Sequence, residues 1–248
     1  MQDLFVSELA VTVGRGLREN VGFELQIPFR LVRDRVEYLD LARQPYQPPN
    51  PGLHHRNETL ARLADPQLGV ALGHRWELWT LAGRAAISIP LGRTEPNPFE
   101  LGHHGLWHQH IQFGTGTWDP IFSLAVARSA GPFELRLSGV SRLTLAENDH
   151  GYRAGNRYSG QFEAAPKLGD DWSAAVGLIL AREEAETWDG RMEAEGNLGR
   201  TDLFLSLAGG RAIPPIGTIA LAIQIPLASE TTGDQVEIPV ILSMTWGR

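Results

Sequence analysis

The sequence predicts an all-β protein, an antiparallel up-and-down transmembrane β-barrel of about twelve strands. Hydrophobic and polar residues alternate along many segments, most of these segments are as long as a bilayer-crossing strand, and the connections between them are alternately short and long. Strands of soluble sandwiches usually have about 5–6 residues, whereas a tilted strand that crosses a bilayer needs about 9–11. Strand length therefore favours a membrane location.

Composition supports one domain that spans residues 1–248, because no linker or shift in composition divides the chain. No stretch approaches the roughly 20 apolar residues that a membrane-spanning helix requires. The 27 glycines and 16 prolines are spread along the chain, as many short turns require. The chain has no cysteine, which removes disulfides and thiolate sites from consideration.

Two-residue alternation is clearest between Val21 and Leu31, where the odd positions are apolar and the even positions include Glu24, Gln26 and Arg30. The same pattern returns at 133–145 and 236–246. We expect eleven strand segments, at about residues 3–14, 20–39, 63–73, 76–91, 113–128, 132–146, 158–166, 172–184, 201–209, 217–227 and 236–247.

The connections between these segments differ in length. Long polar loops are expected at 41–62, 92–112, 147–157, 185–200 and 228–235, with short turns between them. Outer-membrane barrels have short periplasmic turns and longer extracellular loops, with aromatic residues at both interfaces. Candidates for these aromatic girdles are Trp76, Trp118, Phe133, Tyr158, Trp172 and Trp246.

Three similar hexapeptides or heptapeptides, LQIPFR, ISIPLGR and IQIPLAS, each close a strand before a long loop. Proline removes a ladder hydrogen bond, so these sites predict bulges near the outer rim.

Eleven strands would place the two ends of the chain on opposite sides, yet bacterial barrels have an even strand number. We therefore expect a first strand and a signal peptide to be missing from this sequence; a miscounted hairpin is the alternative.

Two motifs carry a family resemblance: GTGTWDP at Gly114–Pro120 and GYRAGNRYS at Gly151–Ser159. In this order and spacing they resemble the outer-membrane transporter family named after the MetA-pathway of phenol degradation, and the likeness runs from about Asp65 to the C-terminus. The resemblance implies a channel in the outer membrane of a Gram-negative bacterium that takes up small hydrophobic or aromatic molecules. The motif residues are Gly114, Gly116, Trp118, Asp119 and Pro120.

The chain departs from the general family at its end, where Trp246 is followed by Gly247 and Arg248. The aromatic end signal that the barrel assembly machinery recognises is therefore present but shifted. Expected partners are this machinery, outer-membrane lipid and lipopolysaccharide, and a small-molecule substrate. Nucleic acid is excluded, because the net charge is −7 and no basic block could neutralise a row of phosphates.

Histidines are concentrated in three of the predicted outer loops. Neutral imidazole binds copper and zinc, so these loops form a candidate metal-capturing mouth; the alternative is that the histidines hydrogen-bond to the loops and hold them closed. No other cofactor is expected. The candidate metal ligands are His54, His55, His103, His104, His108, His110 and His150.

Charged residues of both signs occupy the polar face of the strands. They either set the selectivity of a pore or form salt bridges that close a narrow interior. Asp119 is predicted to anchor its turn by accepting amide hydrogens before Pro120. The candidate lumen residues are Glu24, Arg30, Arg84, Glu134, Arg136, Arg142 and Glu163.

Three functions fit these observations. The leading hypothesis is an outer-membrane channel for small hydrophobic or aromatic molecules, the second is a copper- or zinc-binding outer-membrane protein, and the third is a soluble barrel that binds an apolar ligand inside. The third hypothesis requires apolar residues within and polar residues outside, the reverse of a membrane barrel. An enzyme is not expected, because neither a GxSxG turn nor an HExxH motif occurs.

Overall fold

The computed structural model describes residues 2–47, 49, 57–169, 171–231 and 237–246. None of the helices in these residues is long and apolar enough to cross a membrane. The elements are β1 (Gln2–Arg18), β2 (Val21–Val36), β3 (Glu58–Leu63), β4 (Gln67–Trp76), β5 (Trp79–Ser88), α1 (Pro98–His103), β6 (Asp119–Ala130), β7 (Phe133–Arg142), β8 (Tyr152–Arg153), β9 (Arg157–Pro166), β10 (Trp172–Glu183), β11 (Thr187–Trp188), β12 (Arg200–Ile213), β13 (Gly217–Thr231) and β14 (Val240–Thr245).

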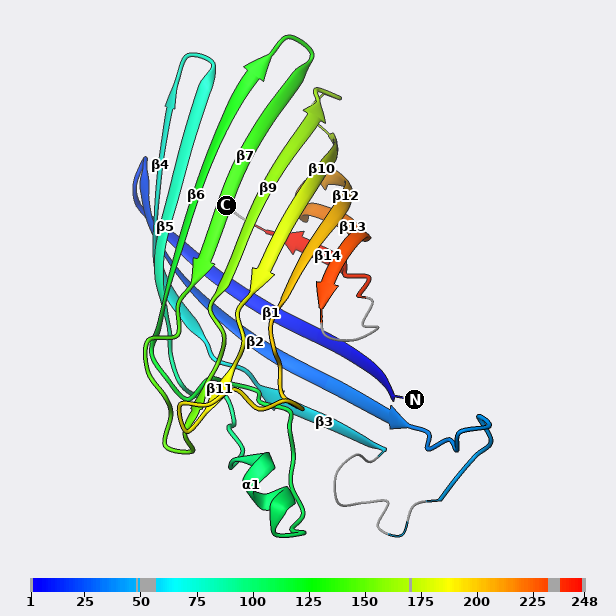
Figure 1. Ribbon diagram of the computed structural model, residues 1–248. Coiled ribbons are helices and arrows are strands. Elements are labelled where there is room, and N and C mark those ends of the chain that lie inside the picture. Colours follow the sequence, from blue (N-terminus) through cyan, green and yellow to red (C-terminus); the bar gives the residue numbers. More distant parts are fainter. Residues whose placement is uncertain (1, 48, 50–56, 170, 232–236, 247–248) are drawn as a thin grey trace.

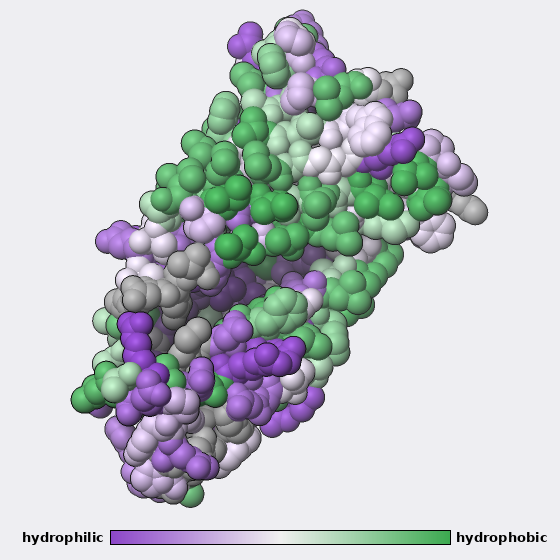
Figure 2. All heavy atoms as spheres, turned by 90° about the vertical axis from the view of Figure 1, so that its right-hand side faces the viewer, coloured by the Kyte–Doolittle hydropathy of each residue, from purple (hydrophilic) through white to green (hydrophobic). Residues whose placement is uncertain are grey.

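The long strands form one antiparallel sheet in the order β1-β2-β4-β5-β6-β7-β9-β10-β12-β13-β14, and β3 pairs with β2 beside β4. The sheet is strongly curved, as Figure 1 shows, and it curls around the hollow that is visible in Figure 2. Strands β1 and β14 are its two edges, and within the described residues each pairs on one side alone. The predicted antiparallel all-β fold is confirmed, whereas the additional first strand stays a prediction.

Each of the eleven predicted segments overlaps a strand of this sheet, but many of the predicted limits were wrong by three residues or more. The segment expected from residue 113 begins at Asp119, because Gly114–Trp118 forms a compact loop, and the segment expected to end at 209 continues to Ile213. Strands β3, β8 and β11 and helix α1 lie within connections that were expected to be irregular.

The connections are segregated by length. The turns after β1, β4, β6, β9 and β12 are short and lie along the upper rim in Figure 1, whereas the connections that contain β3, α1, β8 and β11 lie at the opposite end. This confirms the predicted asymmetry for four of the five long loops; of the fifth, 228–235, residues 228–231 belong to β13 and the rest lie outside the described residues. In this arrangement the long connections can gather over one mouth of the hollow.

The apolar face of the strands is the outer one. On β2 the odd-numbered residues from Phe23 to Phe29 are 36–47% exposed, whereas Glu24, Gln26 and Arg30 are half-buried on the other face. Figure 2 shows the same distribution over the molecule, with a largely hydrophobic outer surface and hydrophilic side chains within the hollow. A soluble barrel with an apolar interior requires the opposite arrangement.

The prolines of the repeated hexapeptides lie where the sheet is irregular. Opposite Pro226 the register between β12 and β13 shifts by one residue, which confirms a bulge there. At Pro28 strand β2 changes partner: it pairs with β4 up to Gln26 and with β3 from Phe29, and the Pro28 carbonyl accepts the Ala64 amide hydrogen at 3.0 Å. Pro90 follows the end of β5.

Aromatic residues mark the strand ends as predicted, and at the turn end two of them pair with arginine. The Arg128 guanidinium lies 5.1 Å from the centre of the Trp79 ring, and that of Arg211 lies 5.0 Å from the Trp172 ring. Both pairs are on the outer face. The six predicted girdle residues are all exposed: Trp76, Trp118, Phe133, Tyr158, Trp172 and Trp246.

Substitution of neighbouring residues tests which face is lipid-facing. Leu137, in the middle of β7, is 58% exposed on the outer face, and we expect Leu137→Arg to lower the free energy of unfolding in lipid vesicles by about 2–4 kcal/mol. Ser138 faces the hollow, where arginine stays hydrated, so Ser138→Arg should cost less than about 1 kcal/mol. Denaturant titration measures both values, and a larger loss for Ser138→Arg would support the soluble barrel instead.

Candidate functional site

Charged side chains on the inner face of the sheet form ion pairs that cross neighbouring strands. Arg84 of β5 pairs with Glu24 of β2, although β4 lies between them, and it also donates to Gln67 Oε1 at 3.1 Å. Gly69 and Ala71 occupy the intervening inner positions of β4. Because these residues are small, the two long side chains can meet above the strand.

The other candidate lumen residues also lie on the inner face and are also paired. Arg136 Nη2 lies 3.0 Å from Glu134, and its Nη1 lies 3.8 Å from Glu163. Arg30 donates to Glu8 Oε2 through Nε at 3.1 Å and Nη2 at 2.8 Å. The structure thus shows salt bridges along the wall, the arrangement expected both of a narrow interior and of a selective pore.

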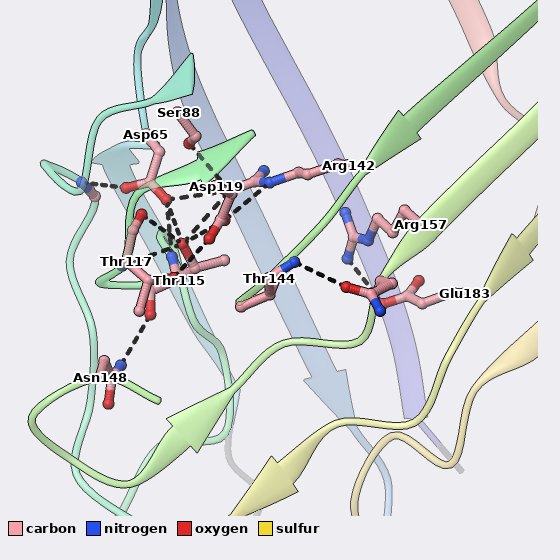
Figure 3. Close-up of polar contacts among 12 residues, drawn as sticks. Asp65, Ser88, Thr115, Thr117, Asp119, Arg142, Thr144, Asn148, Arg157 and Glu183 are labelled. Carbon is pink, nitrogen blue, oxygen red and sulfur yellow. Dashed lines mark hydrogen bonds and ion pairs between the residues drawn. The ribbon is translucent and has the colours of Figure 1, made fainter. Parts of the chain in front are cut away.

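The most deeply buried charges surround Arg142 at the end of β7 (Figure 3). Its guanidinium donates to Asp119 Oδ2 through Nη2 at 2.8 Å and through Nε at 3.1 Å, and Nη2 lies 3.4 Å from Asp65 Oδ2. Ser88 accepts a further bond at 3.1 Å. Asp119 is fully buried and Asp65 is 3% exposed, so their charges depend on Arg142 and on local donors.

These donors come mainly from the GTGTWDP loop. Asp65 accepts the backbone N–H groups of Gly92 and Thr115, both at 2.8 Å, and Asp119 accepts the hydroxyls of Thr115 at 2.8 Å and Thr117 at 2.6 Å. Asp119 therefore anchors the loop through hydroxyl groups and Arg142. Amide hydrogens of the turn were predicted to bind Asp119, but that of Thr115 binds Asp65 Oδ2 at 2.8 Å and that of Thr117 binds the Thr115 hydroxyl oxygen at 3.4 Å.

The remaining motif residues allow the chain to pass close to this cluster. A Cβ atom at Gly114 would clash with the Asp65 carboxylate, and Gly116 has φ +73°, a conformation that favours glycine. Trp118 is exposed beside β6, and the Pro120 carbonyl accepts the Leu143 amide hydrogen at 3.0 Å. The glycines of the motif are thus required because the loop passes close to the buried carboxylates that it encloses.

The connections 89–118, 143–156 and 184–199 pack together into a unit that we call the cap. Strand β8 pairs with β11, and the rings of Tyr152 and Trp188 on these strands lie 4.7 Å apart. Phe99 packs edge-on against Trp188, which is 2% exposed. Asn97 Nδ2 donates to Asp189 at 2.9 Å and so joins the connection that contains α1 to the one that contains β11. The cap therefore has a small core of its own.

Burial also perturbs ionisation within the cap. It raises the pKa of Glu186, although the carboxylate accepts hydrogen bonds from Trp188 Nε1 at 3.3 Å and from the Asn197 amide at 3.2 Å. Burial, with Glu186 nearby, also raises the pKa of Tyr152. Both groups consequently favour their neutral forms.

The predicted histidines are distributed over the cap. His108 is buried, with Nδ1 2.9 Å from the Leu106 carbonyl oxygen, and its ring lies 5.2 Å from that of His110. Within the residues that the structure describes, no three His, Asp or Glu side chains lie close enough together to hold a metal ion. The metal-binding hypothesis stays a prediction. His103 and His104 are exposed, His150 is half-buried, and His54 and His55 lie outside the described residues.

Beneath the cap lies a polar chamber that the sequence did not predict. It extends from the inner face of β1 and β2 to the ends of β7 and β9. The chamber is lined by Arg30, Gln67, Phe113, Arg142, Tyr152 and Arg157, among others.

Comparison with known proteins agrees with this architecture. No protein-family model matches the chain, and no curated protein matches it. Among solved structures it is similar to the COG4313 outer membrane channel from Pseudomonas putida F1, with a TM-score of 0.62, 14% sequence identity, and coverage of 91% of this chain and 77% of that one. At this identity the likeness concerns the fold, which is that of an outer-membrane β-barrel.

Removal of Asp119 should loosen the cap. Asp119→Ala leaves Arg142 and two threonine hydroxyls without their shared acceptor, so we expect a loss of about 3–5 kcal/mol in unfolding free energy and faster hydrogen exchange across 89–118. Asp149→Ala, which removes an exposed carboxylate of the same cap, should change stability by less than about 0.5 kcal/mol. Equal effects of the two variants would show that the buried cluster does not hold the cap.

Glu186 should make the cap more stable in acid. Because its pKa is raised by burial, the folded protein retains a proton that the unfolded chain releases, so this contribution to stability is lost as the pH rises through the raised value. Glu186→Gln keeps the acceptor for Trp188 and Asn197 and should slow hydrogen exchange of 184–199 at about pH 8 but not at about pH 5. The control is Glu147→Gln, at an exposed position, which should leave both hydrogen-exchange rates unchanged. If Glu186→Gln also leaves both exchange rates unchanged, burial of the Glu186 charge does not lower the stability of the cap.

Proposed function

We propose that this protein is a channel of the bacterial outer membrane that admits small hydrophobic or aromatic molecules. The observation that carries the proposal is the orientation of the sheet. Long antiparallel strands curl with their apolar side chains outward and their ion-paired side chains inward, as a wall between lipid and an aqueous passage requires.

The cap and the salt bridges favour a narrow, selective passage over a wide one. The cap is packed around Trp188 and tied to the sheet through Asp65 and Asp119, so a solute has to pass beside it through the polar chamber. Phe113 and Tyr152 contribute aromatic side chains to the lining of this chamber.

Two likenesses support the same proposal. The GTGTWDP and GYRAGNRYS motifs resemble the outer-membrane transporter family of phenol degradation, and the similar solved structure is described as an outer membrane channel. The first motif has a physical role in closing the loop over Asp65 and Asp119. We propose that the aromatic substrate class of that family applies here.

Two measurements on the protein extracted from a Gram-negative membrane test the proposal. The band on an unheated gel should migrate differently from the boiled band, and the purified protein should produce discrete conductance steps in planar bilayers. Protein that was boiled before reconstitution is the control and should give none. A folded protein that yields no conductance, or one that is stable in buffer without detergent, would contradict a channel.

A further inference from the structure

In the buried cluster beneath the cap, the guanidinium of Arg142 is more exposed to the chamber than the carboxylates that it pairs with. Arg142 retains 24% of its side-chain exposure, whereas its partners Asp65 and Asp119 are 1% and 0% exposed. Both carboxylates are enclosed by backbone and hydroxyl donors of the GTGTWDP loop. A solute in the chamber therefore approaches the positive member of this cluster.

Arg157 shows the same asymmetry more strongly. Its side chain is 55% exposed and that of its partner Glu183 is 19% exposed. Among the described residues Arg157 forms one ion pair, from Nη2 to Glu183 Oε1 at 2.9 Å, and Glu183 also accepts a bond from Asn197 at 3.0 Å. A guanidinium carries five N–H donors in a planar fork, so most of those of Arg157 are left for water or a ligand.

The other ion pairs of the inner wall differ among themselves. Deeper along the wall Arg136 is 49% exposed, more than Glu134 at 31% and Glu163 at 16%. In two pairs the carboxylate is the more exposed member: Glu8 with Arg30, which also lines the chamber, and Glu24 with Arg84. The arginine is thus the more exposed partner at Arg142, Arg157 and Arg136, although the chain as a whole has a net charge of −7.

We propose that the chamber is a binding site for a small carboxylate, which Arg157 holds with Arg142 beside it, and that the passage prefers anions. The inference rests on the proposed channel function and names its substrate class as aromatic acids. A carboxylate matches the bidentate geometry of a guanidinium fork, and a charge-assisted hydrogen bond of this kind is stronger than a neutral one. Phe113 and Tyr152 line the same chamber and supply apolar surface for the ring of such an acid.

Reversal potentials in a KCl gradient across planar bilayers test the charge preference. The wild-type channel should pass chloride in preference to potassium, and Arg157→Gln should lower this ratio about threefold to tenfold because one exposed charge is lost from a confined site. Glu183→Gln should raise the ratio. Arg182→Gln is the matched control, since Arg182 is the neighbouring residue on the outer face of β10 and should have no effect.

Block of the chloride current by benzoate tests the binding site itself. Benzoate should reduce the current in the wild-type channel and do so at least about tenfold less potently in Arg157→Gln, whereas benzylammonium, a cation of similar size, should not block. A conducting channel that prefers potassium, or one in which Arg157→Gln leaves both selectivity and block unchanged, overturns this inference and leaves the channel proposal standing. Absence of any conductance from folded protein overturns both.

Discussion

Each long strand of this sheet places successive side chains in two different surroundings, and the whole structure depends on that constraint. A shift of one residue in register would exchange the two faces, so the apolar positions from Phe23 to Phe29 fix which side of β2 faces the hollow. The inner side then has to accommodate charges in a confined space. It does so by pairing them, and small residues such as Gly69 give Glu24 and Arg84 room to meet across β4.

Pairing of opposite charges also organises the mouth of the hollow. Two buried carboxylates, Asp65 and Asp119, share Arg142 and take their remaining hydrogen bonds from a loop that has no other reason to approach the sheet. The position of the loop is therefore set by its hydrogen bonds to these carboxylates. Because the donors enclose the acids, the arginine is the member of the cluster that meets the interior, and the polarity of the chamber follows from how the cap is attached.

The fold could be predicted because strand alternation is a local property of the sequence, and the same parity placed the candidate lumen residues from Glu24 to Glu163 on one face of the strands. Other parts depend on contacts that no local pattern records. Asp65 was included in the predicted strand 63–73 but lies in an irregular stretch between β3 and β4. Trp188 is buried because two distant connections meet. The strand predicted from residue 113 began too early because alternation continues into a loop whose conformation is set by buried aspartates.

The arginine–tryptophan pairs at the turn end have a consequence for how the molecule would sit in a bilayer. Arg128 with Trp79 and Arg211 with Trp172 are on well-separated strands, yet both combine an amphipathic ring with a cation on the outer surface. Such groups prefer the headgroup level. Two anchors at separate points of the wall would hold this end of the protein at the headgroup level, and the cap at the other end could change in size or sequence without displacing them.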